Sequence, residues 1–142
     1  MSRPATWQLP VVRLALPENA ARAPSMGERI SLAVSWALRR CELPRTEVAA
    51  RISDLLGERV SHHMLDGYAS QSRLDHRITL ERFIALVEVT GARELLGFVC
   101  APFGVAAVPA EYAELIELDL LEAELLAVQD RRRAALAGRT AA

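Results

Sequence analysis

Apolar residues recur every three or four positions along most of this chain, a spacing that predicts amphipathic helices. We expect five helices in the middle of the chain, at about 26–41, 45–56, 61–69, 80–90 and 93–101. Capping residues mark their ends: Ser25 with Glu28 has the pattern of a capping box, Ser61 is a good N-cap, and Gly57 and Gly91 are natural stops. A sixth and longer helix is expected from about residue 110 to residue 137.

Two segments depart from the helical pattern. Residues 1–28 contain four prolines, a density that forbids a helix of useful length. The stretches "VVRLAL" (11–16) and "PFGVAAVP" (102–109) have strand composition and could pair with each other. We therefore predict an all-α fold: a compact five-helix helix-turn-helix-type domain with a long C-terminal helix and an extended N-terminal arm. The two stretches of strand composition could add one short β-ribbon.

This pattern also predicts the domain boundaries. The N-terminal arm is expected at 1–25, the helical domain at 26–108 and a C-terminal oligomerisation helix at 109–142. Helical spacing assigns the inward positions of the domain as well. Among those expected inside are Leu55, Leu80, Ile84, Leu96 and Val99, whereas Trp36 is expected at the partly exposed edge of its helix.

The composition is that of an ordinary globular protein. Of the 142 residues, 51% are apolar and 25% are charged. No run approaches the roughly 18 apolar residues that a membrane span needs, and the N-terminus lacks the basic start and apolar stretch of a secretion signal. We therefore expect a cytoplasmic protein in which Cys41 and Cys100 are free buried thiols.

Charge is segregated along the chain, although the net charge is only −1 and all 17 basic residues are arginines. Residues 29–82 carry a net charge of +2, residues 110–130 carry seven acids and no base, and residues 131–142 carry four arginines. The mildly basic segment is the part best suited to meet a polyanion, because the acidic block would repel it.

The residues needed for catalysis or metal binding do not occur in a recognisable pattern. The three histidines, His62, His63 and His76, stand in no motif with a nucleophile or an orienting acid. His62 and His63 are adjacent, so on a helix they point about 100° apart and cannot easily bind one metal ion. The sequence also lacks a phosphate-cradling glycine loop and a paired-carboxylate signature. We expect no enzyme activity, no metal and no cofactor.

The stretch "EVAARISDLLGERVSHHMLDGYAS" (47–70) has the pattern of a helix-turn-helix. Its first helix offers a small residue, Ala49 or Ala50, where the second helix would cross. The second helix begins at Ser61 with two polar residues suited to the major groove, and apolar residues follow one turn later. The connection "DLLGERV" exceeds the usual three or four residues, so we expect the first helix to be longer by about one turn.

A family resemblance supports this interpretation. The motifs "TEVAARIS", "VSHHMLDGYAS" and "RITLERFIALVEVTGARELLGFV" resemble the second, third and supporting helices of phage and prophage regulators of the lambda-repressor-like or CII-like helix-turn-helix kind. The last motif, continued by "FGVAAVP", is similar to CII-type regulators and to small proteins of Mu-like prophages. The resemblance covers residues 29–108 and implies an all-α fold that binds duplex DNA.

We therefore expect sequence-specific, double-stranded DNA binding by a phage-type homo-oligomer, with a dimer favoured. Helix 61–69 would enter the major groove, arginines would contact phosphates, and polar residues of the helix would lie near base edges. The candidate DNA-binding residues are Arg45, Arg59, Ser61, His62, His63, Asp66, Gln71, Arg73 and Arg77.

One alternative is a non-enzymatic adaptor that binds another phage or host protein through the C-terminal helix or the N-terminal arm, without DNA. Another interpretation is that the five helices only pack together, in which case Ser61 would be only a cap and Arg73, Arg77 and Arg82 would form only a solvent-exposed face.

The C-terminal helix is the expected self-association element. Its apolar seam steps by three and four residues, and an antiparallel pairing would bring the arginines at 131–133 toward the acids near Glu111 and Glu114. The seam consists of Leu115, Leu118, Leu121, Leu125 and Val128.

Overall fold

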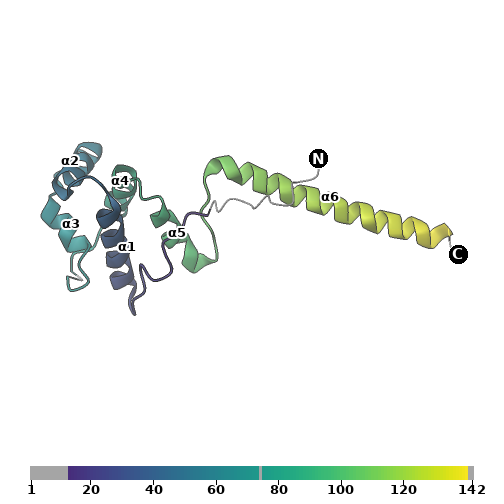
Figure 1. Cartoon of the computed structure of the whole chain (residues 1–142), viewed down its shortest axis with the longest axis horizontal. Coiled ribbons are helices and arrows are strands. Elements are labelled where there is room, and N and C mark those ends of the chain that lie inside the picture. Colours follow the sequence, from purple (N-terminus) through teal and green to yellow (C-terminus); the bar gives the residue numbers. More distant parts are fainter. Residues whose placement is uncertain (1–12, 74, 141–142) are drawn as a thin grey trace. The chain divides into compact units, whose positions relative to one another are not determined.

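Helices make up almost all of the regular structure, as Figure 1 shows. The computed structural model describes residues 13–73 and 75–140. Its elements are α1 (Met26–Arg40), α2 (Arg45–Leu56), α3 (His62–Tyr68), α4 (Leu80–Thr90), α5 (Glu94–Cys100), a 3₁₀ turn η1 (Ala101–Phe103) and α6 (Ala110–Thr140). No described residue belongs to a β-strand. The all-α fold and the long C-terminal helix predicted from the sequence are confirmed.

The chain divides into two units, a helical one at residues 13–107 and a second that contains α6. Residues 13–25, which the sequence pattern assigned to the arm, belong to the helical unit, and Leu16, Ala20 and Ala21 pack against its core. The part of the expected arm at residues 1–12 lies outside the described residues.

Local capping explains where the helices begin and end. Ser25 and Glu28 form the expected capping box at the start of α1. The Ser61 side chain accepts a hydrogen bond from the backbone of Met64 at the start of α3, and the Thr79 side chain caps α4 in the same way. These caps supply partners for backbone N–H groups that a helix leaves unpaired in its first turn.

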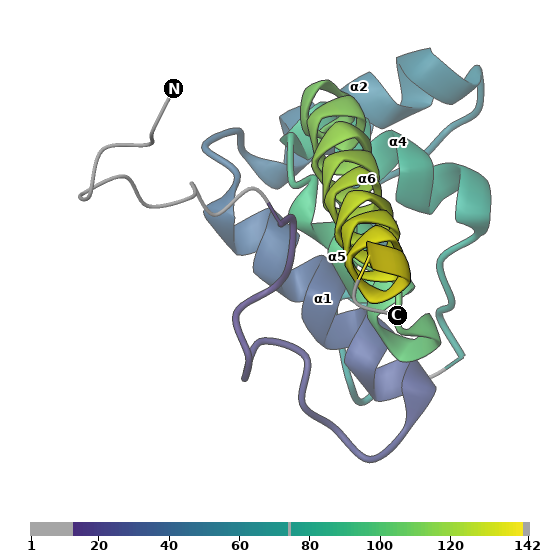
Figure 2. The same ribbon diagram turned by 90° about the vertical axis from the view of Figure 1, so that its right-hand side faces the viewer.

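The core of the helical unit lies between α1, α2, α3, α4 and α5. Helices α2 and α4 are the most closely packed pair and lie side by side in Figures 1 and 2. The largest fully buried side chains are Val34, Val48, Ile52, Leu65, Leu86 and Leu95. Every one of these five helices therefore contributes a side chain to the same core.

Several positions expected to be inside are instead exposed. Leu80 is 73% exposed and Ile84 is 56% exposed, while Leu55, Leu96 and Val99 are also exposed. Helix α4 shows the reason, because it has apolar residues on two faces. The face with Phe83 and Leu86 is buried, and the face with Leu80 and Ile84 is exposed. A helix with apolar residues on two faces does not reveal by periodicity which face is buried.

The expectation for Trp36 was also wrong. This residue is 8% exposed and belongs to the core, rather than to a partly exposed edge. The guanidinium of Arg40 lies over the indole ring, 4.8 Å from its centroid, and covers it from the outside.

The expected β-ribbon is reduced to a single antiparallel bridge between Leu14 and Ala107. The Leu14 N–H donates to the carbonyl oxygen of Ala107 at 2.8 Å, and residues 11–12 lie outside the described part. At this point the chain passes directly over α5, because a Cβ atom at Gly97 would lie 1.8 Å from the Leu14 carbonyl oxygen. Only glycine fits this crossing.

Helix α6 spans 31 residues, none of which is buried. Its acids occupy the N-terminal two-thirds and its arginines follow. Among the described helices, α6 included, we find none with the length and apolar character that crossing a membrane requires.

Candidate nucleic-acid interface

The connection between α2 and α3 is longer than in an ordinary helix-turn-helix. Five residues, 57–61, separate the two helices, whereas three or four are usual. Gly57 ends α2 with a φ of 66°, a left-handed conformation that favours glycine. The side chain of Val60 is 4% exposed and anchors the far end of the turn in the core.

Ser53 closes this long turn from inside α2. Its Oγ accepts a hydrogen bond from the Val60 N–H at 2.8 Å. The hydroxyl proton has two carbonyl acceptors within reach, Ala49 at 2.8 Å and Val60 at 3.0 Å. The sequence pattern did not single out Ser53, because its contact with the turn is made to Val60, seven residues further along the chain. Of the two small residues expected at the helix crossing, Ala49 is buried and Ala50 is exposed.

Arg82 of α4 ties the same turn from outside. Its Nε donates to Glu58 Oε1 at 3.0 Å, and its Nη1 donates to the hydroxyl of Tyr68 at the end of α3. The hydrogen bonds to Tyr68 and Glu58 raise the pKa of Arg82 above its ordinary value, so the guanidinium stays charged. Arg82 is therefore a clamp on the turn and on α3, rather than part of the solvent-exposed face that a purely structural domain would have.

The first turn of α3 presents polar side chains to solvent. His63 is exposed and His62 is half-buried, and their rings contact each other with centroids 3.9 Å apart. One turn further, Leu65 and Tyr68 are buried in the core. The helix is thus held by its apolar face while its N-terminal polar edge remains available for a ligand, the arrangement by which recognition helices present side chains to base edges.

Two of the candidate residues are ion-paired with each other. Arg45, at the start of α2, donates a hydrogen bond from Nη1 to the Asp66 carboxylate on α3. Both side chains are 40% exposed. A phosphate at Arg45 would therefore compete with Asp66 for the guanidinium, and Asp66 can meet a base only by loosening this pair.

Three further candidates lie on either side of α3. Arg59 is exposed in the turn before the helix, and Gln71 and Arg73 are exposed in the loop after it. Within residues 13–73 and 75–140, the side chains of Arg59 and Arg73 have neither an ion pair nor a hydrogen bond. Both guanidinium groups are thus available to a phosphate without breaking an existing contact.

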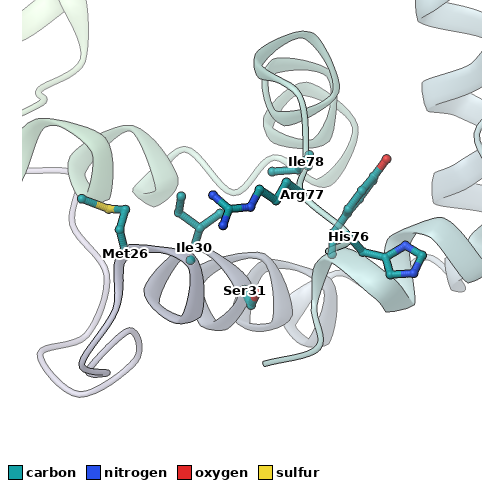
Figure 3. A pocket seen from close by; sticks show the side chains of 8 residues that line it. Met26, Ile30, Ser31, His76, Arg77 and Ile78 are labelled. Atoms are coloured by element: carbon teal, nitrogen blue, oxygen red, sulfur yellow. The ribbon is translucent and has the colours of Figure 1, made fainter. Parts of the chain in front are cut away.

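Arg77 lies beside a cavity of about 270 Å³ between the start of α1 and the loop that precedes α4. In Figure 3 its guanidinium extends toward Ile30 of α1, whereas the His76 imidazole points away from Met26 and Ile30. The His76 ring is in close contact with Gly67, where an added Cβ atom would lie 3.1 Å from it. Arg77 would have to turn away from the cavity to reach a phosphate on the α3 side.

The described residues contain no group of three or more histidine, cysteine or acidic side chains that could hold a metal ion. Comparison with protein-family models, with curated proteins and with solved structures finds no match to this chain. The class that the structure defines is an all-α chain, with short helices α1 to α5 followed by the long C-terminal helix α6.

Proposed function

We propose that this chain is a cytoplasmic, phage-type regulator that binds specific double-stranded DNA as a homo-oligomer, with α3 in the major groove. His62 and His63 read base edges, Ser61 fixes the start of the helix, and Gln71 contacts either a base or the backbone. Arg59 and Arg73 neutralise phosphates on either side of α3. This role requires no catalytic residue and no cofactor.

The observation that carries the proposal is the two-sided character of α3. Its apolar side is fixed by Leu65 and Tyr68, while its first turn is capped by Ser61 and presents polar rings to solvent. A helix that served only to pack would not need an exposed polar N-terminal edge flanked by unpaired arginines. This is the combination that direct readout of the major groove requires, because bases are read by donors and acceptors and phosphates by cations.

The long turn is compatible with this function because it is rigidly held. Ser53 ties its far end to α2, and Arg82 ties Glu58 and Tyr68 to α4. Readout depends on a recognition helix whose position is fixed before binding, since ordering it on the DNA would lower the affinity. The extra residues therefore extend the motif without leaving α3 loose.

A second function is favoured by one feature. The exposed apolar side chains of α6 would also suit an adaptor that binds another phage or host protein without DNA. The two functions differ in where the ligand binds, which is α3 for the regulator and α6 for the adaptor. Substitutions in α3 would then leave adaptor binding intact.

Fluorescence anisotropy with labelled duplexes tests the proposal. DNA sites are first selected from random and genomic fragments, and the affinity of the full chain is then measured against salt concentration. Replacing His62 and His63 together by Ala should cost on the order of 1–3 kcal/mol on the selected site and much less on random DNA. Arg59→Gln or Arg73→Gln should weaken both DNAs alike and flatten the log–log salt slope by about 0.9.

The matched control is Arg93→Gln, which removes an exposed arginine at the start of α5 and should leave both affinities unchanged. Absence of binding by the unaltered chain, even at low salt, would reject DNA binding. Equal losses on selected and random DNA in the histidine variant would mean that α3 does not read the sequence.

A further inference from the structure

The C-terminal helix α6 carries a continuous apolar seam on one face. Its members, Leu115, Leu118, Leu121, Leu125 and Val128, are between 50% and 58% exposed. The last four step by three, four and three residues, the spacing with which helices pack side by side. Burying such a seam is favourable, because each large aliphatic side chain removed from water contributes to association.

Opposite charges stand at the two ends of this seam. Glu114 and Arg132 are eighteen residues apart, and eighteen residues make five turns of 3.6 residues. The two side chains therefore project from the same face of α6, about 27 Å apart along the helix axis. The seam thus runs from an acid at its N-terminal end, through leucines, to an arginine at its C-terminal end.

This distribution of charged and apolar residues is complementary to that of a second copy of α6 that runs in the opposite direction. The midpoint between Glu114 and Arg132 is Ala123, and the same midpoint relates Leu118 to Val128. A two-fold axis at residue 123 therefore places each of these residues against its counterpart in a second copy. Leu121 and Leu125 form the central layers in the same register.

We propose that α6 pairs with α6 of a second copy in an antiparallel manner, with the two-fold axis at residue 123. The pair holds two Glu114–Arg132 contacts at its ends, one for each copy. On the flank of the seam, the same register brings Glu117 toward Arg131 of the second copy. This inference defines the homo-oligomer of the proposed function, but it does not require that the chain bind DNA.

A parallel pair would face the opposite situation. Glu114 would meet Glu114 of the second copy, and Arg132 would meet Arg132, so that every charged layer of the seam would be repulsive. Glu117 would also lie near Glu122 of the second copy, which adds another like-charge contact on each flank. Charge therefore selects the antiparallel orientation, while the leucines supply the attraction.

Charge reversal at the two ends of the seam tests the orientation. The dimer dissociation constant of the full chain is measured by sedimentation equilibrium for the unaltered protein, for Glu114→Arg, for Arg132→Glu and for the double variant. Each single change should weaken the dimer about tenfold, because it turns both attractive contacts into repulsive ones. The double variant should return to within about twofold of the unaltered chain, because the contacts are restored with reversed signs.

The control is Asp130→Arg, which reverses an exposed acid on the outer face of α6, where it pairs with Arg133 of its own chain. It should change the dissociation constant by less than about twofold. A chain that is monomeric at about 100 µM would overturn the proposal. A double variant that is weaker than either single variant would equally overturn the antiparallel register.

Disulfide trapping gives an independent measure in a background with Cys41→Ser and Cys100→Ser. The variants Leu121→Cys and Leu125→Cys should cross-link with each other when mixed, and neither should cross-link efficiently alone. In a parallel pair each variant would instead cross-link with itself, since identical residues would then meet within disulfide range. Neither measurement contains DNA, so a failure of DNA binding would not change the conclusion on the pairing of α6. A monomer that binds DNA would refute the pairing of α6 but not the proposed DNA binding.

Discussion

Replacing Ser53 by Ala should weaken the helical unit, mainly because the Val60 N–H loses its hydrogen-bond acceptor. The Val60 N–H donates to the Ser53 hydroxyl, and Val60 itself is buried, so water cannot easily replace the lost acceptor. A buried donor left without a partner costs about 1–3 kcal/mol. Alanine is the better helix former by about 0.5 kcal/mol, which offsets part of this loss. The expected net decrease in the free energy of unfolding is therefore about 0.5–2.5 kcal/mol.

Thermal unfolding followed by circular dichroism measures this effect. For a unit of this size, each kcal/mol lowers Tm by about 4–8 °C, so we expect a decrease of roughly 2–20 °C. Ser35→Ala is the matched control, because Ser35 is also a partly buried helical serine and has no hydrogen-bonded side chain in the described part of the chain. The control should be neutral or slightly stabilising. If the two variants unfold at the same temperature, Ser53 does not hold the turn.

Three other substitutions have defined outcomes. Gly97→Ala should destabilise the helical unit by about 1–3 kcal/mol and expose residues 13–25 to proteolysis, because the new methyl group would collide with the Leu14 carbonyl. The control Gly138→Ala adds a methyl group in open space and should be neutral or stabilising. Arg82→Gln should lower the free energy of unfolding by about 1–2 kcal/mol in urea titrations, since it breaks the contacts to Glu58 and Tyr68, and an unchanged midpoint would contradict its role as a clamp. Asp66→Asn should release Arg45 and strengthen binding to all DNA sequences, with a salt slope steeper by up to about 0.9; unchanged affinity would show that Arg45 meets no phosphate.

Local signals in the sequence predicted the helices well. Capping residues such as Ser25, Ser61 and Gly57 act within a few positions of themselves, so their effect can be predicted without knowledge of the fold. The choice of buried face was less predictable. On α4 both Ile84 and Leu86 are apolar, and only packing against α2 decides that Leu86 is inside.

The candidate site shows a corresponding limit. The sequence indicated which side chains have suitable chemistry for DNA binding. It did not indicate which of them already form ion pairs or hydrogen bonds with each other. Arg45 and Asp66 are twenty-one residues apart, and Arg82 lies twenty-four residues from Glu58. Pairs at such separations form only if the helices cross at a suitable angle. The spacing of apolar residues along the sequence does not determine this angle.

The pairing of Arg45 with Asp66 changes how the candidate interface should be understood. An arginine that already has a carboxylate partner gains less from a phosphate than one that is solvated, because the existing ion pair must first be broken. Arg59 and Arg73 carry no such cost. If α3 enters a groove, the phosphates next to the long turn and next to Arg73 should therefore be held more strongly than those next to the start of α2. Arg59 itself belongs to the five-residue connection between α2 and α3, so the lengthened turn is what supplies this arginine.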